Sequence, residues 1–230
     1  MPTILITGAS KGIGQAIAIK LASHGTHIFI HGRDQKGLAH TSKEIVKRGG
    51  KATQIMADIS TPEGCDELFK SVGKTSLDVL INNAGIPMKK SLSALTLNDW
   101  NKTVAVNVTA PFLITQKFLP RLKKGSTIVY ILSGAAKYVF PDASAYCMSK
   151  FGLRGFAEAL REELRPKGIR VINIFPSSVD TALWEAMPGN WPREKMMVPN
   201  DVAEAVAFAI SRPSGVMVDD ITIGSIAGRL

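Results

Sequence analysis

Four polar residues in the middle of the chain, Asn107, Ser133, Tyr146 and Lys150, have side chains that can take part in proton transfer. If Tyr146 and Lys150 lie on one helix, their separation of four positions places both on the same helix face. A free phenol has a pKa of about 10, and a neighbouring ammonium lowers that pKa because it favours the phenolate. The pair therefore predicts a tyrosine that can act as an acid or a base near neutral pH.

A glycine-rich segment, Thr7–Gly14, precedes these residues and lies between a predicted strand and a predicted helix. Because glycine has no Cβ, Gly8, Gly12 and Gly14 allow a tight turn and the close approach of a pyrophosphate. The start of the helix adds free N–H groups and the positive end of the helix dipole. The segment predicts a dinucleotide site. Its G-x-x-x-G-x-G spacing differs from G-x-G-x-x-G, so a glycine turn without function is the alternative.

The end of the second predicted strand bears on the choice of cofactor. In dinucleotide folds an acidic residue about 20 residues after the glycines binds the ribose 2′-OH of NAD, whereas arginine accommodates the 2′-phosphate of NADP. Here Gly32 occupies the acidic position, Arg33 follows it, and Lys11 is a second cation near the same phosphate. We therefore predict NADP(H) over NAD(H). Asp34 opposes this prediction because it could pair with Arg33.

Short apolar runs alternate with longer segments of helical period along the chain, which indicates repeated βα units and a parallel sheet. With 230 residues, the chain fits one α/β domain. Strands are predicted at Thr3–Thr7, His27–His31, Ala52–Ala57, Leu77–Asn82, Ser126–Leu132, Arg170–Phe175 and Ile221–Gly224. Helices are predicted at Gly12–Ser23, Gln35–Lys47, Pro62–Ser71, Asn98–Leu122, Ser144–Arg165 and Asn200–Ser211. The order predicts a single doubly wound (Rossmann) sheet of about seven parallel strands, with helices on both faces.

Several of the polar motifs fall at the carboxyl ends of predicted strands, where ligands of such sheets bind. Asp58 follows the third strand, Asn82–Gly85 ends the fourth, Ser133 ends the fifth, and Pro176–Thr181 follows the sixth. We expect these residues to meet in one crevice. Asp58 is placed for the adenine amino group, and an N-cap or Asx turn ahead of Pro62 is its structural alternative.

The series Thr7–Gly14, Asn82–Gly85, Asn107, Ser133, Tyr146–Lys150 and Pro176–Thr181 resembles the motifs of the short-chain dehydrogenase/reductase (SDR) family over nearly the whole chain. The resemblance implies hydride transfer between NADP(H) and a carbonyl or secondary alcohol. Tyr146 would exchange the proton, Lys150 would lower its pKa and bind the nicotinamide ribose, Ser133 would hold the reacting oxygen, and Asn107 would anchor a water. The implied cofactor contacts are Gly8, Ser10, Lys11, Gly12, Ile13, Gly14, Arg33, Asp58, Ile59, Asn83, Ala84, Gly85, Tyr146, Lys150, Pro176, Val179 and Thr181. Ser177 departs from the family, which usually has glycine after this proline, so the turn there could differ.

A proline inside the fourth predicted helix gives the role of Asn107 an independent reason. Pro111 lies four residues after Asn107 and has no N–H to donate to the Asn107 carbonyl. We hypothesise that this carbonyl accepts a hydrogen bond from a water that links Lys150 to solvent. The alternative is a kinked helix whose free carbonyl faces a side chain or bulk water.

Residues 182–199 are predicted to form a substrate lid because they follow the sixth strand and contain Trp184, Met187, Trp191, Met196 and Met197. Such side chains suit an apolar or ring-bearing carbonyl substrate. They could equally pack the segment on the body of the protein or on a neighbouring subunit.

Composition limits the other classes of function. The net charge of +9 is spread in short pairs without a basic run, so we expect no nucleic-acid partner. No apolar segment reaches the ~20 residues of a membrane helix, and the N-terminus enters a strand pattern at once, so we expect a cytoplasmic protein with no membrane partner. Two distant cysteines indicate no metal site or disulfide, and the four histidines are interpreted as structural or surface residues.

Family members are usually homodimers or homotetramers, and Phe151, Leu153, Phe156 and Leu160 permit such an interface but equally serve the core. Two other functions remain open. One is a non-catalytic NADP-binding regulator, and the other is a lyase or epimerase on the same scaffold.

Overall fold

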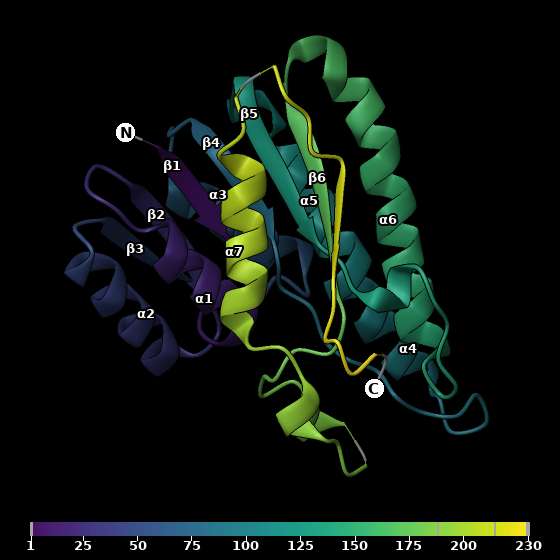
Figure 1. Ribbon diagram of the computed structural model, residues 1–230. Coiled ribbons are helices and arrows are strands. Elements are labelled where there is room, and N and C mark those ends of the chain that lie inside the picture. Colours follow the sequence, from purple (N-terminus) through teal and green to yellow (C-terminus); the bar gives the residue numbers. More distant parts are fainter. Residues whose placement is uncertain (1, 188, 214, 229–230) are drawn as a thin grey trace.

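The computed structural model describes residues 2–187, 189–213 and 215–228, and its centre is one parallel β-sheet (Figure 1). The sheet has seven strands in the order β3-β2-β1-β4-β5-β6-β7. Their bounds are β1 Thr3–Ile6, β2 His27–Gly32, β3 Lys51–Met56, β4 Leu77–Asn82, β5 Leu122–Ile131, β6 Arg170–Pro176 and β7 Asp220–Ile223. The winding direction reverses between β1 and β4, which pair through Ile4 with Val79 and Ile6 with Ile81. The predicted doubly wound fold is confirmed.

Helices cover both faces of this sheet, as Figure 1 shows. One face carries α1 (Gly12–Leu21), α2 (Gln35–Lys47) and α7 (Pro199–Ile210). The other carries α3 (Pro62–Val72), α5 (Ala110–Phe118) and α6 (Ser144–Leu164), and α4 (Leu97–Val104) packs against α6. Side chains at the helix starts fix where the chain turns, because Asp34 caps α2, Thr61 caps α3, and Thr96 forms a capping box with Asp99 on α4.

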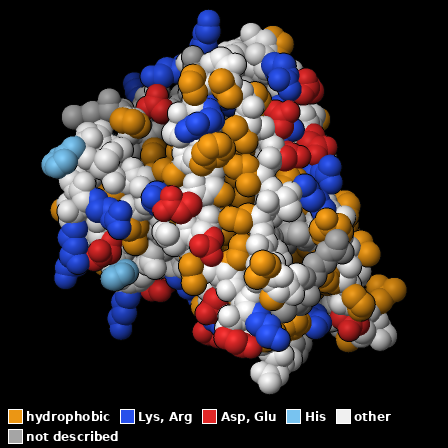
Figure 2. Space-filling model, in the orientation of Figure 1, with side chains coloured by type: hydrophobic (Ala, Val, Ile, Leu, Met, Phe, Trp, Pro, Cys, Tyr) orange, Lys and Arg blue, Asp and Glu red, His pale blue; other side chains and the backbone are white. Residues whose placement is uncertain are grey.

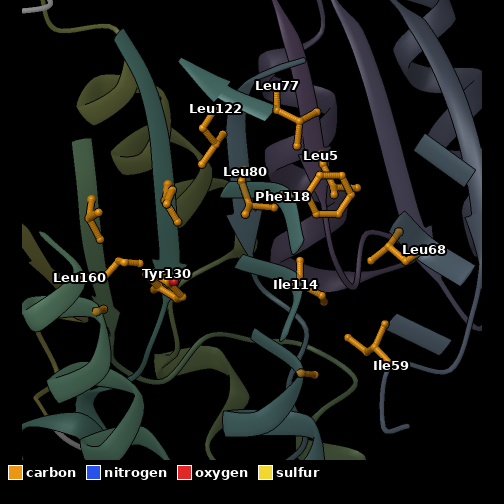
Figure 3. Close-up of a cluster of buried hydrophobic side chains, with 14 of the residues drawn as sticks. Leu5, Ile59, Leu68, Leu77, Leu80, Ile114, Phe118, Leu122, Tyr130 and Leu160 are labelled. Atoms are coloured by element: carbon orange, nitrogen blue, oxygen red, sulfur yellow. The ribbon is translucent and has the colours of Figure 1, made fainter. Parts of the chain in front are cut away.

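Each layer of helices buries its own hydrophobic cluster against the sheet. The cluster under α3, α5 and α6 contains fully buried Leu68, Phe118 and Tyr130, and Figure 3 shows how these side chains fill the space beside β4 and β5. The cluster under α1, α2 and α7 contains Ile17, Leu38 and other aliphatic side chains. Because the central strands are buried on both faces, they are apolar at successive positions rather than at alternate ones.

The predicted helix Asn98–Leu122 is not continuous. It divides into α4, a π-helical segment η1 (Ala105–Thr109), α5 and a short 3₁₀ turn, η2 (Leu119–Arg121), and β5 begins at Leu122. The Ala110 N–H donates to the Ala105 carbonyl across the wide turn. Pro111 explains the interruption, because a residue without an N–H cannot complete the α-helical bond to Asn107.

Apolar side chains also reach the surface beside β7, the edge strand of the sheet. Figure 2 shows them gathered between α7 and β7, where Phe208 and Val216 are exposed and Ile221 and Ile223 are partly buried. Within the described ranges, no helix combines the length and apolarity needed to cross a membrane.

Candidate active site

The loops after β1 and β4 are joined at the point where the sheet reverses. The Thr7 hydroxyl accepts hydrogen bonds from the N–H groups of Asn83 and Ala84, at 3.0 and 3.1 Å. The Asn83 side-chain amide donates to the carbonyls of Thr7 and Gly8, at 2.9 and 3.0 Å. The carboxyl ends of the two strands therefore form one rigid platform. This bridging role of Thr7 was not predicted from the sequence, because it becomes visible only when the two strand ends lie side by side.

The glycine turn is closed tightly against this platform. Gly8 and Gly12 have φ values of +67° and +60°, which side chains rarely adopt. A Cβ on Gly14 would overlap the Gly8 carbonyl and the Asn83 amide, and a Cβ on Gly12 would lie 3.2 Å from the Thr181 methyl group. Thr181, predicted from a distant motif, thus lies beside the turn. The space that these glycines keep free is where the backbone N–H groups at the start of α1 can reach a phosphate.

The two cations predicted to select the cofactor, Lys11 and Arg33, are both exposed at this edge. Asp34 does not neutralise Arg33. Its carboxylate accepts a hydrogen bond from the Lys36 N–H as the N-cap of α2, and within the described chain Arg33 forms no ion pair. The side chain of Arg33 is therefore available to a phosphate. The possible pairing of Asp34 with Arg33, which opposed the prediction of NADP(H), is not formed in the structure.

Asp58 forms the Asx turn that the sequence left open as an alternative, since its carboxylate accepts from the Ser60 N–H at 3.1 Å. This hydrogen bond lowers the pKa of Asp58, and the carboxyl remains exposed at the same edge. Ile59 behind it is buried.

Ser10 and Ile13 are partly buried in the glycine turn, and the Ser10 carbonyl accepts from the Gln15 side chain.

The predicted catalytic set comes together at the ends of β4 and β5. Tyr146 and Lys150 lie on α6, and the Lys150 ammonium is 5.8 Å from the centre of the Tyr146 ring. Ser133 follows β5 and hydrogen-bonds the Tyr146 phenol. Tyr146 stays partly exposed while Lys150 is 4% exposed, so Lys150 is the more deeply buried of the two.

Burial controls the protonation of this pair. It raises the pKa of Tyr146, and the hydrogen bond with Ser133 opposes that rise. Burial also lowers the pKa of Lys150 to about 8. The direction for Tyr146 is opposite to the lowering predicted from sequence, because the loss of water around the phenol has a larger effect on its pKa than the hydrogen bond with Ser133. The ammonium itself donates to the Ile131 carbonyl, at 3.2 Å.

Asn107 is almost fully buried in the π-helical segment η1, and its side chain holds the loop after β4. Its amide donates to the Ile86 carbonyl at 3.0 Å and its oxygen accepts from the Ile86 N–H at 2.9 Å. The same amide contacts the Ser149 hydroxyl on α6, at 3.1 Å. Ser149 was missed in the sequence, although its place immediately before Lys150 was a usable signal. A Cβ on Gly85 would lie 3.3 Å from the Asn107 oxygen and 3.6 Å from the Lys150 amine.

Strand β6 ends at Pro176, and the segment that follows it is fastened to the body of the protein. Val179 is buried and pairs with Met197 in a β-bridge, and Asp180 forms an ion pair with Arg193. Ser177 donates from its backbone to the Ile223 carbonyl without a positive φ, so it replaces glycine there without strain.

The apolar residues of the predicted lid divide into two groups, and Pro188 lies outside the described residues. Met196 and Met197 are buried, in agreement with the alternative that they pack on the body. Trp184 and Trp191 pack against each other with ring centres 4.7 Å apart, and the Lys89 amine from the loop after β4 lies 4.3 Å from the centre of the Trp191 ring. This contact joins the lid segment to the platform.

Comparison with known proteins agrees with this arrangement. Residues 2–190 match the family described as short chain dehydrogenase. A sepiapterin reductase of Chlorobaculum tepidum is 33% identical, with 99% of this chain and 97% of that protein aligned. An uncharacterized oxidoreductase of Staphylococcus saprophyticus is 31% identical over 95% of each chain. The protein belongs to the short-chain dehydrogenase family, and the resemblance inferred from its motifs is confirmed.

Solved structures of similar proteins extend the agreement to three dimensions. An alcohol dehydrogenase of the archaeon Thermococcus sibiricus, complexed with 5-hydroxy-NADP, has a TM-score of 0.91 and 28% identity, with 100% of this chain and 99% of that chain covered. The angucycline C-6 ketoreductase LanV with bound NADP has a TM-score of 0.88 and 30% identity, with 99% and 96% covered. The chain is thus an oxidoreductase of this family by sequence and by fold.

Proposed function

We propose that the protein transfers a hydride between NADP(H) and the carbonyl or secondary alcohol of a small molecule. The observation that carries this proposal is that Tyr146 hydrogen-bonds Ser133 and has the Lys150 amine 5.8 Å from its ring centre, at the same edge of the sheet as the glycine turn. A proton donor for a carbonyl oxygen and a site for a dinucleotide then share one edge of the sheet. When bound, the nicotinamide supplies or accepts the hydride.

The residues at this edge fit a phosphorylated dinucleotide. The glycine turn leaves space that a single Cβ at Gly14 would fill, as a pyrophosphate-binding turn requires. Lys11 and Arg33 bind the 2′-phosphate, since both are exposed and Arg33 is not paired with Asp34. Similar proteins solved with NADP or NADPH support this choice over NAD. Asp58, Asn83 and Thr181 complete the contacts.

The proton is handled by side chains on α6 and β5. Tyr146 donates its phenolic proton to the carbonyl oxygen in reduction and removes it from the alcohol in oxidation. Ser133 orients the reacting oxygen through the hydroxyl that already contacts the phenol. Lys150 remains protonated at neutral pH, because its pKa is about 8. Its charge stabilises the phenolate that remains after proton transfer, and its amine binds the nicotinamide ribose.

Asn107 connects this pair to solvent through a bound water. The π-helical turn and Pro111 together leave the Asn107 carbonyl without its α-helical donor. In the proposed relay this carbonyl accepts a hydrogen bond from a water that passes protons to Lys150. The Asn107 side chain is committed to Ile86, so it fixes the position of the carbonyl rather than contacting substrate.

The substrate is an apolar or ring-bearing carbonyl compound. This part of the proposal is supported by the paired rings of Trp184 and Trp191 beside the end of β6, with residues 182–199 acting as a lid. The buried Met196 and Met197 anchor the lid and make no contribution to specificity.

The protein functions in the cytoplasm as a homodimer or homotetramer, without nucleic-acid or membrane partners. Of the four apolar residues considered for an interface on α6, Leu153 and Leu160 are core residues, and Phe156 packs edge-on against Tyr130. Phe151 remains 39% exposed, and Phe112 on α5 is 40% exposed. These two side chains favour a subunit contact through α5 and α6.

The test is consumption of NADPH, and separately of NADH, by the purified protein with ketones, aldehydes, sugars and hydroxysteroids. We expect turnover with NADPH, and an about 10³-fold loss of kcat in Tyr146→Phe, because general acid catalysis is removed. Tyr130→Phe is the matched control, since its hydroxyl bonds Thr115 in the core, and it should keep kcat within about twofold. NADPH should bind both variants.

Two outcomes would replace the proposal. Tight NADPH binding without turnover on any carbonyl compound would support the regulator. Conversion of a substrate without net oxidation of NADPH would support the lyase or epimerase.

A further inference from the structure

The second strand ends in a buried histidine that joins the glycine turn to the loop after β3. His31 is 2% exposed. Its Nε2 lies 3.1 Å from the Ala57 carbonyl, and its Nδ1 lies 3.5 Å from the Gly8 N–H nitrogen, in a long hydrogen bond. The backbone carbonyl of His31 also accepts from the Ala9 N–H at 2.8 Å. One residue thus contacts the ends of β1 and β3, the two strands that flank β2.

The partners of the imidazole define its protonation state. The Ala57 carbonyl can only accept, so Nε2 carries a proton, whereas the Gly8 N–H can only donate, so Nδ1 carries none. The ring is therefore neutral with its proton on Nε2. An imidazolium would place a second N–H against the Gly8 N–H, and the two donors would repel each other.

We propose that neutral His31 is a positioning residue that holds the glycine turn and the Ala57–Asp58 loop at the separation needed to bind the adenosine half of the cofactor, and that its protonation releases the cofactor. The proposal rests on the NADP(H) site described above. His31 does not touch the reacting atoms, so its effect falls on cofactor affinity rather than on proton transfer.

The surroundings of the ring favour the neutral form at physiological pH. Burial lowers the pKa of His31, and Arg33 on the same strand end lowers it further. The Ala57 carbonyl and Asp58 on the next loop act in the opposite direction but more weakly than burial. Because the pKa of His31 is depressed in the folded state, its hydrogen bonds to Gly8 and Ala57 are both intact at neutral pH. The bond to Gly8 is lost as the pH falls through that pKa.

Three substitutions separate the two hydrogen bonds. In His31→Asn the side-chain oxygen can replace Nδ1 and accept from Gly8, whereas in His31→Gln the terminal amide can replace Nε2 and donate to Ala57. His31→Leu removes both. The matched control is His27→Asn at the opposite end of β2, where the imidazole contacts the Thr53 hydroxyl at 2.8 Å, away from the glycine turn.

The first measurement is the Kd of NADPH by fluorescence titration without substrate, from pH 5 to 8. At pH 7.5 we expect about 10-fold weaker binding for His31→Leu, several-fold weaker binding for His31→Asn and His31→Gln, and no change for His27→Asn. The phosphate of the cofactor itself titrates near pH ~6. The decisive quantity is therefore the ratio of Kd values, which should shrink toward one as the pH falls through the pKa of His31 and wild type loses the hydrogen bond to Gly8.

The second measurement needs no cofactor. A long-range ¹H–¹⁵N spectrum of histidine-labelled protein, with His31 assigned by its loss in His31→Asn, should give the neutral Nε2–H form at pH 7. An imidazolium at that pH, or unchanged Kd in all three variants, overturns the proposal. If wild type binds no NADPH, the cofactor site fails with it, whereas equal NADPH binding by wild type and variants refutes only the role of His31. Should His31→Leu not fold, the Kd ratios of His31→Asn and His31→Gln decide.

Discussion

The two halves of the sheet meet at the same edge but build their parts of the site from different materials. On the β1–β3 side, the chain offers backbone groups, empty space beside glycines, and exposed cations such as Arg33. On the β4–β6 side, it offers buried side chains, with Asn107 1% exposed and Lys150 4% exposed. In the proposed function, the two halves have different tasks. Phosphates require N–H donors and room, whereas proton transfer requires side chains held in a fixed, water-poor geometry.

This contrast predicts two kinds of sensitivity to substitution. In the β1–β3 half, adding atoms does harm because the backbone has no space to give. In the β4–β6 half, removing a functional group does harm although the shape is kept, and stability can even rise because buried polar groups are costly.

Gly14→Ala should give the largest effect and is the most direct attempt to break the comparison. The new methyl group would overlap the Gly8 carbonyl and the Asn83 side chain. We expect NADPH binding to weaken by more than about 100-fold, with a lower Tm, because the turn must open to relieve the overlap. Titration of NADPH fluorescence and a thermal melt measure both effects.

Gly152→Ala on α6 is the matched control for that variant. A Cβ there meets no atom within 4 Å, so this substitution should leave NADPH affinity unchanged and raise stability by about 0.5–1 kcal/mol. Normal NADPH binding by Gly14→Ala would show that the turn is not closed as described.

Arg33→Ser tests whether the exposed cations of the first half act by charge. Arg33 is unpaired with Asp34, so its loss should weaken NADPH binding by about 10- to 100-fold and leave NADH binding nearly constant. The ratio of kcat/KM for the two cofactors measures this change. Asp34→Ser is the control, because it removes the N-cap of α2 and should lower Tm without improving NADPH binding. An equal loss for both cofactors would contradict phosphate recognition.

The sequence predicts the two halves unequally well. The fold follows from the alternation of apolar runs and helical periods, and five of the six predicted helices and six of the seven predicted strands match the structure to within a few residues. The exceptions lie in the segment 97–131. There Pro111 predicted a free carbonyl and a possible kink, but not that the interruption takes the form of a π-helical turn. The residues proposed as catalytic could be selected from the sequence because their chemistry is specific to residue type.

Other features of the site depend on three-dimensional surroundings and therefore escaped prediction. Thr7 and Ser149 lie inside the quoted motifs, but their roles were missed because the sequence does not show which groups their hydroxyls contact. His31 was interpreted as structural or surface, since only the register of β1, β2 and β3 places it between Gly8 and Ala57. The sequence predicted a lowered pKa for Tyr146, whereas burial raises it. A spacing of four residues reveals the neighbouring amine but not the loss of water around the phenol.

Lys150→Met should change the free energy of unfolding only modestly, but it tests the contrast between the two halves most sharply. We expect it to raise stability while abolishing turnover. Burial lowers the pKa of Lys150 from 10.5 to about 8, so the folded state disfavours the charged amine. Between those two values the unfolded state binds more protons, and the stability of the wild type therefore rises with pH across that window. Below about pH 8 the full penalty remains.

Methionine keeps a similar volume and removes this penalty, at the cost of the hydrogen bond to Ile131. We expect Lys150→Met to be about 1–2 kcal/mol more stable than wild type at pH 7, and the gain to shrink by pH 10. Urea unfolding without cofactor at the two pH values measures the difference, and the Gly152→Ala gain should be the same at both. If Lys150→Met is less stable than wild type at pH 7, the amine must have more favourable contacts than the one to the Ile131 carbonyl. The buried polar groups of the β4–β6 half would then not lower the stability of the protein.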